Sequence, residues 1–286
     1  MISGKMKEYV QKAKFLGLLF LTLMLIVTLS LTTHSGLANA QNKTLLQSQG
    51  TPNMATTTNA TNMNIVLVHG TSIDGSSWSK VIAILQNAGH KVIAVQLPLH
   101  SLADDVATTK RAIDLIGGPV ILVGHSYGGF VITNAAYNNP NVKGLVYIAA
   151  FAPQEGQTLG NFIDPAKLPK GFVIIDKGGF VYLNPNIFPQ AVAADADPAQ
   201  AKVLAAAQKP YNQSILAEKS GPPAWKQLPT WDQISENDYL IPPAAQHLFA
   251  KQMNATTISL ASSHTSYISH PNEIAAFILK AANGIR

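Results

Sequence analysis

The segment around residue 126 joins an expected strand to an expected helix through a turn that few residues can form. Residues 120–123 (Val-Ile-Leu-Val) are a continuous apolar run, which is typical of a strand covered on both faces. Gly124-His-Ser126-Tyr-Gly128 follows directly, and a helical pattern continues over residues 130–137. A Gly-x-Ser-x-Gly turn in this setting holds its serine in a strained backbone geometry, so the neighbouring residues must lack bulk. The pattern therefore predicts a serine presented at a strand–helix junction.

Strands and helices alternate along most of the chain, and this alternation predicts the fold class. Expected strands cover residues 65–68, 92–95, 119–123, 142–149 and 256–260, and the apolar runs at 65–68 and 92–95 predict buried strands. Helical patterns separate the strands, the last beginning at Pro271. Such alternation implies right-handed βαβ units and an α/β fold with a doubly wound, mostly parallel sheet. A sheet of this kind accommodates residues 63–286 as one domain.

The alternation lapses from about residue 154 to residue 229. Residues 172–176 and 180–184, separated by Lys-Gly-Gly, have the pattern of a β-hairpin, and Asp197-Pro198 begins an alanine-rich helix. We interpret this segment as a cap inserted over the carboxyl edge of the sheet rather than as an independent domain.

The first 40 residues have the pattern of a secretory signal peptide. Lysines up to Lys14 precede an uncharged run, Phe15 to Leu31, and Ala38-Asn-Ala40 forms a small-x-small site. We expect cleavage after Ala40, a secreted or periplasmic protein, and no stable membrane association after cleavage. The alternative is an uncleaved anchor, although the apolar run is at the short end of what spans a bilayer. Residues 41–62 lack periodicity and predict a disordered lead-in.

Charge and cysteine content exclude several classes of function. Of the 20 basic and 15 acidic residues, four lysines and one glutamate belong to the first 40 positions, so the remainder is nearly balanced. No basic stripe with interleaved aromatic residues is present, which makes a nucleic-acid partner unexpected. The absence of cysteine excludes disulfides, thiolate metal sites and thiol catalysis.

A serine hydroxyl needs a base to take its proton, and the chain offers eight histidines. His264 lies in a loop just beyond the last expected strand, at the same carboxyl edge of the sheet as Ser126. We therefore predict that His264 is the base. The other histidines have structural or surface interpretations: His34 in the signal peptide, His69 bracing a turn, His125 pointing away from the serine, His90 and His100 at the surface, His247 on a helix and His270 capping the last helix.

An orienting carboxylate should lie between Ser126 and His264 in chain order. The candidates are Asp232, Glu236 and Asp238. Asp238 falls at the end of the expected seventh-strand position, but residues 231–235 are less apolar than a buried strand should be. The residues alone thus favour Asp238 and leave the other two open.

A tetrahedral intermediate needs two main-chain N–H groups directed at its oxyanion. Tyr127, directly after the serine, should supply one, and Thr71, in the His69-Gly70-Thr71 turn after the first strand, should supply the other. The turn lacks the glycine and lysine pattern of a phosphate loop. No metal or organic cofactor is implied.

From Asn64 to the C-terminus the chain resembles the α/β-hydrolases, and more narrowly the small esterases related to plant methylesterases and hydroxynitrile lyases, with their bacterial relatives. The resemblance implies Ser126 as nucleophile, Asp238 as acid, His264 as base, and Thr71 with Tyr127 as oxyanion donors. Its carriers are Val68-His-Gly-Thr71, Gly75-Ser-Ser-Trp78, Ala88-Gly-His-Lys-Val92, Gly124-His-Ser-Tyr-Gly-Gly129, Asp238-Tyr-Leu-Ile-Pro242, and His264 seven residues before Pro271.

Two departures from the family pattern bear on the activity. Hydroxynitrile lyases carry threonine where this chain has Gly70, and lysine directly after the histidine, where this chain has Thr265. That lysine handles the charge of departing cyanide, so its absence argues against lyase activity. Serine at position 126 excludes the chemistry of related hydrolases that use an aspartate nucleophile.

The expected function is hydrolysis of a small to medium hydrophobic carboxylic ester through an acyl-enzyme. Aromatic residues of the cap suggest an apolar substrate, although such side chains more often pack in a cap core; they are Phe172, Phe180, Tyr182 and Phe188. The alternatives are cofactor-free perhydrolysis or acyl transfer by the same residues, and a binding protein that retains the fold without turnover.

Overall fold

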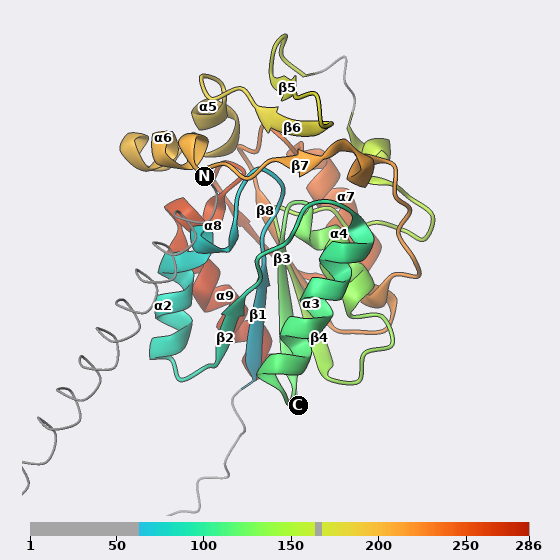
Figure 1. Cartoon of the computed structure of the whole chain (residues 1–286). Helices are drawn as coiled ribbons and strands as arrows, with labels where there is room; N and C mark the ends of the chain where they lie inside the picture. Colours follow the sequence, from blue (N-terminus) through green and yellow to red (C-terminus); the bar gives the residue numbers. More distant parts are fainter. Residues whose placement is uncertain (1–62, 164–167, 286) are drawn as a thin grey trace, which may run out of the picture. The chain divides into compact units, whose positions relative to one another are not determined.

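The computed structural model describes residues 63–163 and 168–285 (Figure 1). The expected signal peptide and lead-in lie outside these residues. None of the helices in the described ranges combines the length and apolar character that a membrane crossing requires.

A six-stranded parallel sheet forms the centre of the described domain, as the alternating pattern predicted. β1 pairs with β2 on one side and with β3 on the other, so the strand order reverses between β1 and β3, where open α/β sheets place their ligand sites. The strands, in spatial order, are β2 (Val92–Ala94), β1 (Asn64–Val68), β3 (Val120–His125), β4 (Val142–Ile148), β8 (Thr230–Ser235) and β9 (Thr256–Leu260).

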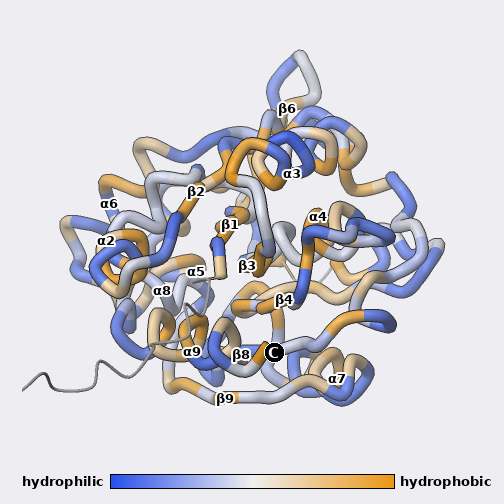
Figure 2. The backbone as a smooth tube through the Cα atoms, turned by 90° about the horizontal axis from the view of Figure 1, so that it is seen from below, coloured by the Kyte–Doolittle hydropathy of each residue, from blue (hydrophilic) through white to orange (hydrophobic). Residues whose placement is uncertain are grey.

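Helices cover both faces of this sheet, and Figure 2 shows the two groups from below. On one face α2 (Ser79–Asn87) and α9 (Pro271–Gly284) pack against a core that includes Trp78. On the other face lie α3 (Leu102–Ile116), α4 (Gly128–Ala135) and α7 (Pro243–Met253), whose core includes Phe130. Ser101 caps the N-terminus of α3, since its hydroxyl accepts a hydrogen bond from the main-chain N–H of Asp104 (3.0 Å).

Two strands differ from expectation. β2 is half-buried rather than buried, because it lies at the sheet edge and has a single strand neighbour. β8 is the reverse case: its polar sequence made a buried strand doubtful, yet every residue of it is buried between β4 and β9. One polar side chain is accommodated by hydrogen bonds, since Gln233 bonds the hydroxyls of Ser235 and Ser266.

The described part of the segment between β4 and β8, called the cap below, lies above the carboxyl ends of the strands (Figure 1). The expected hairpin is present as β5 (Val173–Ile175) and β6 (Phe180–Leu183), and β7 (Tyr211–Asn212) completes an antiparallel sheet. Two helices, α5 (Phe188–Val192) and α6 (Pro198–Ala206), follow the hairpin. Short 3-10 turns complete the described elements: η1 (Gly75–Trp78), η2 (Leu159–Phe162), η4 (Gln213–Leu216) and η5 (Ala224–Lys226), with the single-turn α8 (Ser266–Ser269) before α9.

The four aromatic residues of the cap differ in burial. Phe172 and Phe188 are buried in the core that also contains Trp78, whereas Phe180 and Tyr182 are only partly buried. The first pair therefore has the packing role that such residues usually have.

Candidate active site

Ser126 lies at the sharp turn between β3 and α4 in a left-handed backbone conformation, with φ of 54°. This region is costly for a residue with a side chain, so surrounding contacts must hold it. The main-chain N–H of Ser126 donates to the main-chain oxygen of Ile148 (3.3 Å). The main-chain oxygen of Ser126 accepts the N–H groups of Gly129 (3.0 Å) and Phe151 (3.2 Å). The strained turn predicted from the sequence is therefore present and is held from both sides.

The turn after β1 lies directly against Ser126. A Cβ atom added at Gly70 would be 2.7 Å from the Cβ of Ser126, closer than such atoms approach in proteins. A Cβ at Gly128 would be 2.5 Å from the main-chain oxygen of Val68. Glycine at these two positions permits the end of β1 and the start of α4 to meet around the serine.

The main-chain N–H groups of Thr71 and Tyr127, near Ser126, have no acceptor within the described part of the chain. Thr71 is half-buried and Tyr127 is buried, and main-chain donors so placed normally have a partner. The Tyr127 side chain is anchored because its hydroxyl donates to Oδ2 of Asp105 (2.9 Å). The two donors are therefore available to an oxygen of a bound molecule.

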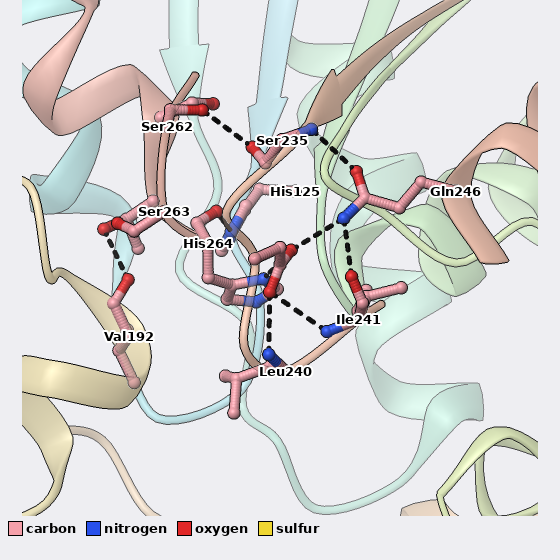
Figure 3. A network of polar contacts seen from close by, with 12 residues as sticks. His125, Val192, Ser235, Leu240, Ile241, Gln246, Ser262, Ser263 and His264 are labelled. Carbon is pink, nitrogen blue, oxygen red and sulfur yellow. Dashed lines mark hydrogen bonds and ion pairs between the residues drawn. The ribbon is translucent and has the colours of Figure 1, made fainter. Parts of the chain in front are cut away.

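His264 and Asp238 form a buried pair near the end of β8 (Figure 3). Nδ1 of His264 lies 2.8 Å from Oδ2 of Asp238, and the side chains are 3% and 0% exposed. Oδ1 accepts the main-chain N–H groups of Leu240 (2.8 Å) and Ile241 (3.0 Å), and Gln246 donates to Oδ2 (2.8 Å). Hydrogen bonds on both oxygens thus hold the carboxylate in place. Because Nδ1–H points at Asp238, Nε2 of neutral His264 is the nitrogen that can accept a proton.

His125 connects this pair to the serine turn. Nε2 of His125 donates to the main-chain oxygen of His264 (3.0 Å), and the two rings are 4.6 Å apart between centroids. The ring of the residue preceding Ser126 thus packs on His264. Within the described part of the chain no hydrogen bond joins the hydroxyl of Ser126 to His264, and such bonds often tighten only when substrate is bound.

The other two candidate acids have different surroundings from Asp238. Glu236 is exposed and pairs with His247, which lies on α7 as expected (3.2 Å). Asp232 points into the core from β8, and neither of its oxygens has a partner among the described residues. Burial raises the pKa of Asp232 well above its usual value. Neither carboxylate touches His264, so the geometry favours Asp238.

Of the remaining histidines, His69 braces the turn after β1 as predicted. Its Nδ1–H donates to the oxygen of Gly70 (2.7 Å), and its Nε2 accepts the main-chain N–H of Leu97 (3.0 Å). Burial lowers the pKa of His69 to about 4, which keeps it in the neutral form that this pattern requires.

Two other histidines differ from expectation. His90 is buried rather than at the surface, because its Nδ1 bonds the main-chain oxygen of Met63 (2.7 Å), whereas His100 is exposed. His270 occupies the position before α9, but its side chain makes no capping bond and contacts the hydroxyl of Ser269 instead (2.9 Å).

Three residues of this site escape sequence reasoning: Gln246, which bonds Asp238; His125, which bonds His264; and Asp195, a cap residue that bonds the main chain of Ser263 next to His264. Each acts on a residue far away in the sequence, and no local motif marks such contacts. Residues 63–163 and 168–285 contain no group of three or more histidine, aspartate or glutamate side chains arranged to hold a metal ion.

Comparison with known proteins gives consistent matches. Residues 65–277 match the alpha/beta hydrolase family. A carbendazim-hydrolysing esterase of Nocardioides sp. is 36% identical over 130 residues, which is 41% of this chain and 53% of that protein. A pyrethroid hydrolase of Sphingobium wenxiniae is 31% identical over 120 residues, 38% of this chain and 43% of that protein. These two matches therefore span only about half of each relative. A crystal structure of a methylesterase from Arabidopsis superposes with a TM-score of 0.68 at 20% identity, over 78% of this chain and 100% of that one.

Proposed function

Because the chain belongs to the alpha/beta hydrolase family, we propose that it is a serine hydrolase that cleaves carboxylic esters through an acyl-enzyme. The observation that carries the proposal is the buried His264–Asp238 pair beside a strained serine turn, where the N–H groups of Thr71 and Tyr127 have no acceptor among the described residues. Relatives named as an esterase, a pyrethroid hydrolase and a methylesterase support the same reaction class.

In the proposed mechanism, the Ser126 hydroxyl oxygen attacks the ester carbonyl carbon while its proton passes to Nε2 of His264. Asp238 keeps Nδ1–H in place and stabilises the cationic imidazole. The negative oxygen of the tetrahedral intermediate accepts hydrogen bonds from the N–H groups of Thr71 and Tyr127.

Collapse of that intermediate breaks the bond to the alcohol, which leaves with the proton from His264, and Ser126 remains acylated. Water then attacks the acyl carbon and gives its proton to the same nitrogen. The second intermediate breaks to release the carboxylic acid and returns the proton to Ser126.

The residue after His264 supports hydrolysis over lyase chemistry. Thr265 is fully buried, and its hydroxyl donates to the main-chain oxygen of Val192 (2.9 Å). It therefore offers no positive charge to a departing cyanide. For the substrate we propose a small to medium hydrophobic ester, since the partly buried Phe180 and Tyr182 belong to the cap sheet above the strand ends.

A panel of chromogenic esters with varied acyl length, run on wild type and on Ser126→Ala in parallel, tests the reaction. We expect ester turnover and covalent labelling by a fluorophosphonate in wild type, and loss of both in Ser126→Ala. A wild-type protein that folds but neither turns over nor becomes labelled would identify a binding protein instead. Product analysis with added alcohol or peroxide separates hydrolysis from acyl transfer and perhydrolysis.

The acid and the base are tested by matched substitutions. His264→Ala should lower turnover by at least about 100-fold. Asp238→Asn should lower it strongly, whereas Glu236→Gln, the same change on a neighbouring exposed carboxylate, should leave it near wild type. Greater sensitivity at Glu236 than at Asp238 would contradict the assignment.

We also propose that the protein is exported and cleaved after Ala40. N-terminal sequencing of the mature protein should then begin at Gln41. Recovery of the uncleaved chain in the membrane fraction would support the anchor alternative.

A further inference from the structure

One carboxylate of the cap bonds the segment that carries His264 at two places. Asp195 lies in the connection between α5 and α6, and its Oδ2 accepts the main-chain N–H of Ser263 (3.0 Å). Its Oδ1 accepts the hydroxyl of Ser263, and its Oδ2 also accepts the hydroxyl of Ser269 (2.9 Å). Nδ1 of His270 lies 3.7 Å from the same oxygen. Asp195 therefore joins the residue before His264 to the turn that follows it.

A second contact from the cap lies between these two places. The N–H and the hydroxyl of Thr265 both donate to the main-chain oxygen of Val192 (3.2 and 2.9 Å), at the end of α5. Val192 is among the side chains labelled around His264 in Figure 3. The cap thus bonds the residues on either side of His264.

The sheet domain bonds His264 itself. Asp238 accepts its Nδ1–H, and His125 donates to its main-chain oxygen. Neither bond reaches Ser263, whose main chain is bonded from the cap. Hydrogen bonds to an ionised acceptor are about twice as strong as neutral ones, and only 26% of the Asp195 side chain is exposed. Loss of Asp195 would therefore remove the bonds from the cap to Ser263 and Ser269, on either side of His264, while Asp238 and His125 stay in place.

We propose that Asp195 is a positioning residue that couples the seating of the cap to the alignment of His264. This inference rests on the proposed function, because it concerns the base of that reaction. With the cap seated, Ser263 and Ser269 are bonded and Nε2 of His264 is held toward the serine turn. When the cap lifts from this segment, the same bonds break and the base loses its alignment, so the site is competent only beneath a closed cap.

The test compares Asp195→Ala with Asp197→Ala. Asp197 lies two residues away and caps α6 by accepting the N–H groups of Ala199 and Gln200 (3.0 Å each). It is thus a cap carboxylate with comparable main-chain bonds whose partners lie on its own helix. Because small misplacements of a catalytic group are costly, we expect Asp195→Ala to lower kcat about 10- to 100-fold for a short soluble ester, with KM little changed. The rate of fluorophosphonate labelling should fall by a similar factor. Asp197→Ala should lower Tm but leave kcat near wild type.

A spectroscopic measurement separates positioning from turnover. The low-field NMR resonance of the His264 Nδ1–H, assigned by its loss in His264→Ala, should broaden or shift in Asp195→Ala and stay unchanged in Asp197→Ala. This readout holds even if the wild-type protein shows no esterase activity, so failure of the proposed function and failure of this inference are distinguishable. Wild-type kcat and resonance in Asp195→Ala, or equal loss in both variants, would overturn the proposal. If Asp195→Ala does not fold, the double variant Ser263→Ala/Ser269→Ala removes two of the donors instead and should give the same drop in kcat, while an unchanged kcat would count against it.

Discussion

Nε2 of Gln246 lies 2.8 Å from Oδ2 of Asp238, the carboxylate oxygen that also accepts the Nδ1–H of His264. The same amide nitrogen donates to the main-chain oxygen of Ile241 (2.8 Å), and the amide oxygen accepts the N–H of Ser235 (3.0 Å). A single buried side chain of α7 thus joins the end of β8 to the proposed acid (Figure 3).

Replacing this amide by a carboxylate should impair the proposed acid in a pH-dependent way. In Gln246→Glu the introduced carboxylate would face the carboxylate of Asp238. Two negative charges this close repel each other, so the pair favours binding one proton between them. We expect kcat/KM, relative to wild type at the same pH, to be lower at pH 8 than at pH 5.5, where the introduced carboxyl group is protonated and can again donate.

The control for this variant is Gln252→Glu, which makes the same change on the same helix at a residue bonded to the oxygen of Ala152. A constant ratio of Gln246→Glu to wild type across the pH range would show that Gln246 does not act on the acid.

The contact between the turn after β1 and the serine gives a steric prediction. In Gly70→Ala the new methyl group would meet the Cβ of Ser126, so the serine or the turn must shift. We expect kcat/KM to fall at least about 10-fold. Gly117→Ala is the control, since a Cβ there meets no atom within 4 Å. The backbone strain of alanine at its positive φ should lower stability and leave kcat/KM near wild type. Full activity in Gly70→Ala would mean that the two segments are less tightly apposed than the structure has them.

The lowered pKa of His69 leads us to expect that the protein loses stability in acid. Its pKa in the folded protein is about 4, below the ordinary 6.5, so the stability that it contributes is complete above pH 6.5 and is lost as pH falls toward 4. The loss amounts to about 3 kcal/mol. Urea denaturation of wild type and His69→Asn at pH 7 and pH 4 measures it: the free energy of unfolding of the variant should fall less over this range. Parallel pH dependence in both proteins would contradict the role of His69.

Asp232 predicts the opposite pH dependence. Its raised pKa favours the neutral form in the folded protein, so its contribution to stability is greatest below its unfolded pKa and declines as pH rises. Asp232→Val removes two buried oxygens that have no partner among the described residues, and it should raise the free energy of unfolding at pH 7 by about 1–3 kcal/mol. This gain should shrink toward pH 4, where the unfolded carboxyl is also protonated.

Activity of the same variant checks the choice of acid. Asp232→Val should retain wild-type kcat, because Asp238 is the carboxylate that contacts His264. A large loss of turnover in a stably folded Asp232→Val protein would return Asp232 to the list of candidate acids.

Several errors of sequence reasoning share a cause. The apolar run of β2 suggested burial, but the strand lies at the sheet edge. The polar run of β8 argued against a buried strand, but two of its polar side chains bond partners far away in the sequence: Gln233 bonds Ser266, and Ser235 bonds Ser262. His90 was expected at the surface and is buried beside Met63. In each case the neighbour that decides burial comes from another part of the chain.

Local sequence was sufficient where the controlling physics is local. The apolar runs predicted most strands and helices. The glycines around Ser126 predicted its strained turn, because the steric constraint acts within a few residues. The contact with His264 that favours Asp238 over Asp232 and Glu236 is visible only in the tertiary structure, as are the contacts of Gln246, His125 and Asp195. These contacts join residues that are far apart in the sequence and that the sheet brings together. No periodic pattern of residue types marks such hydrogen bonds.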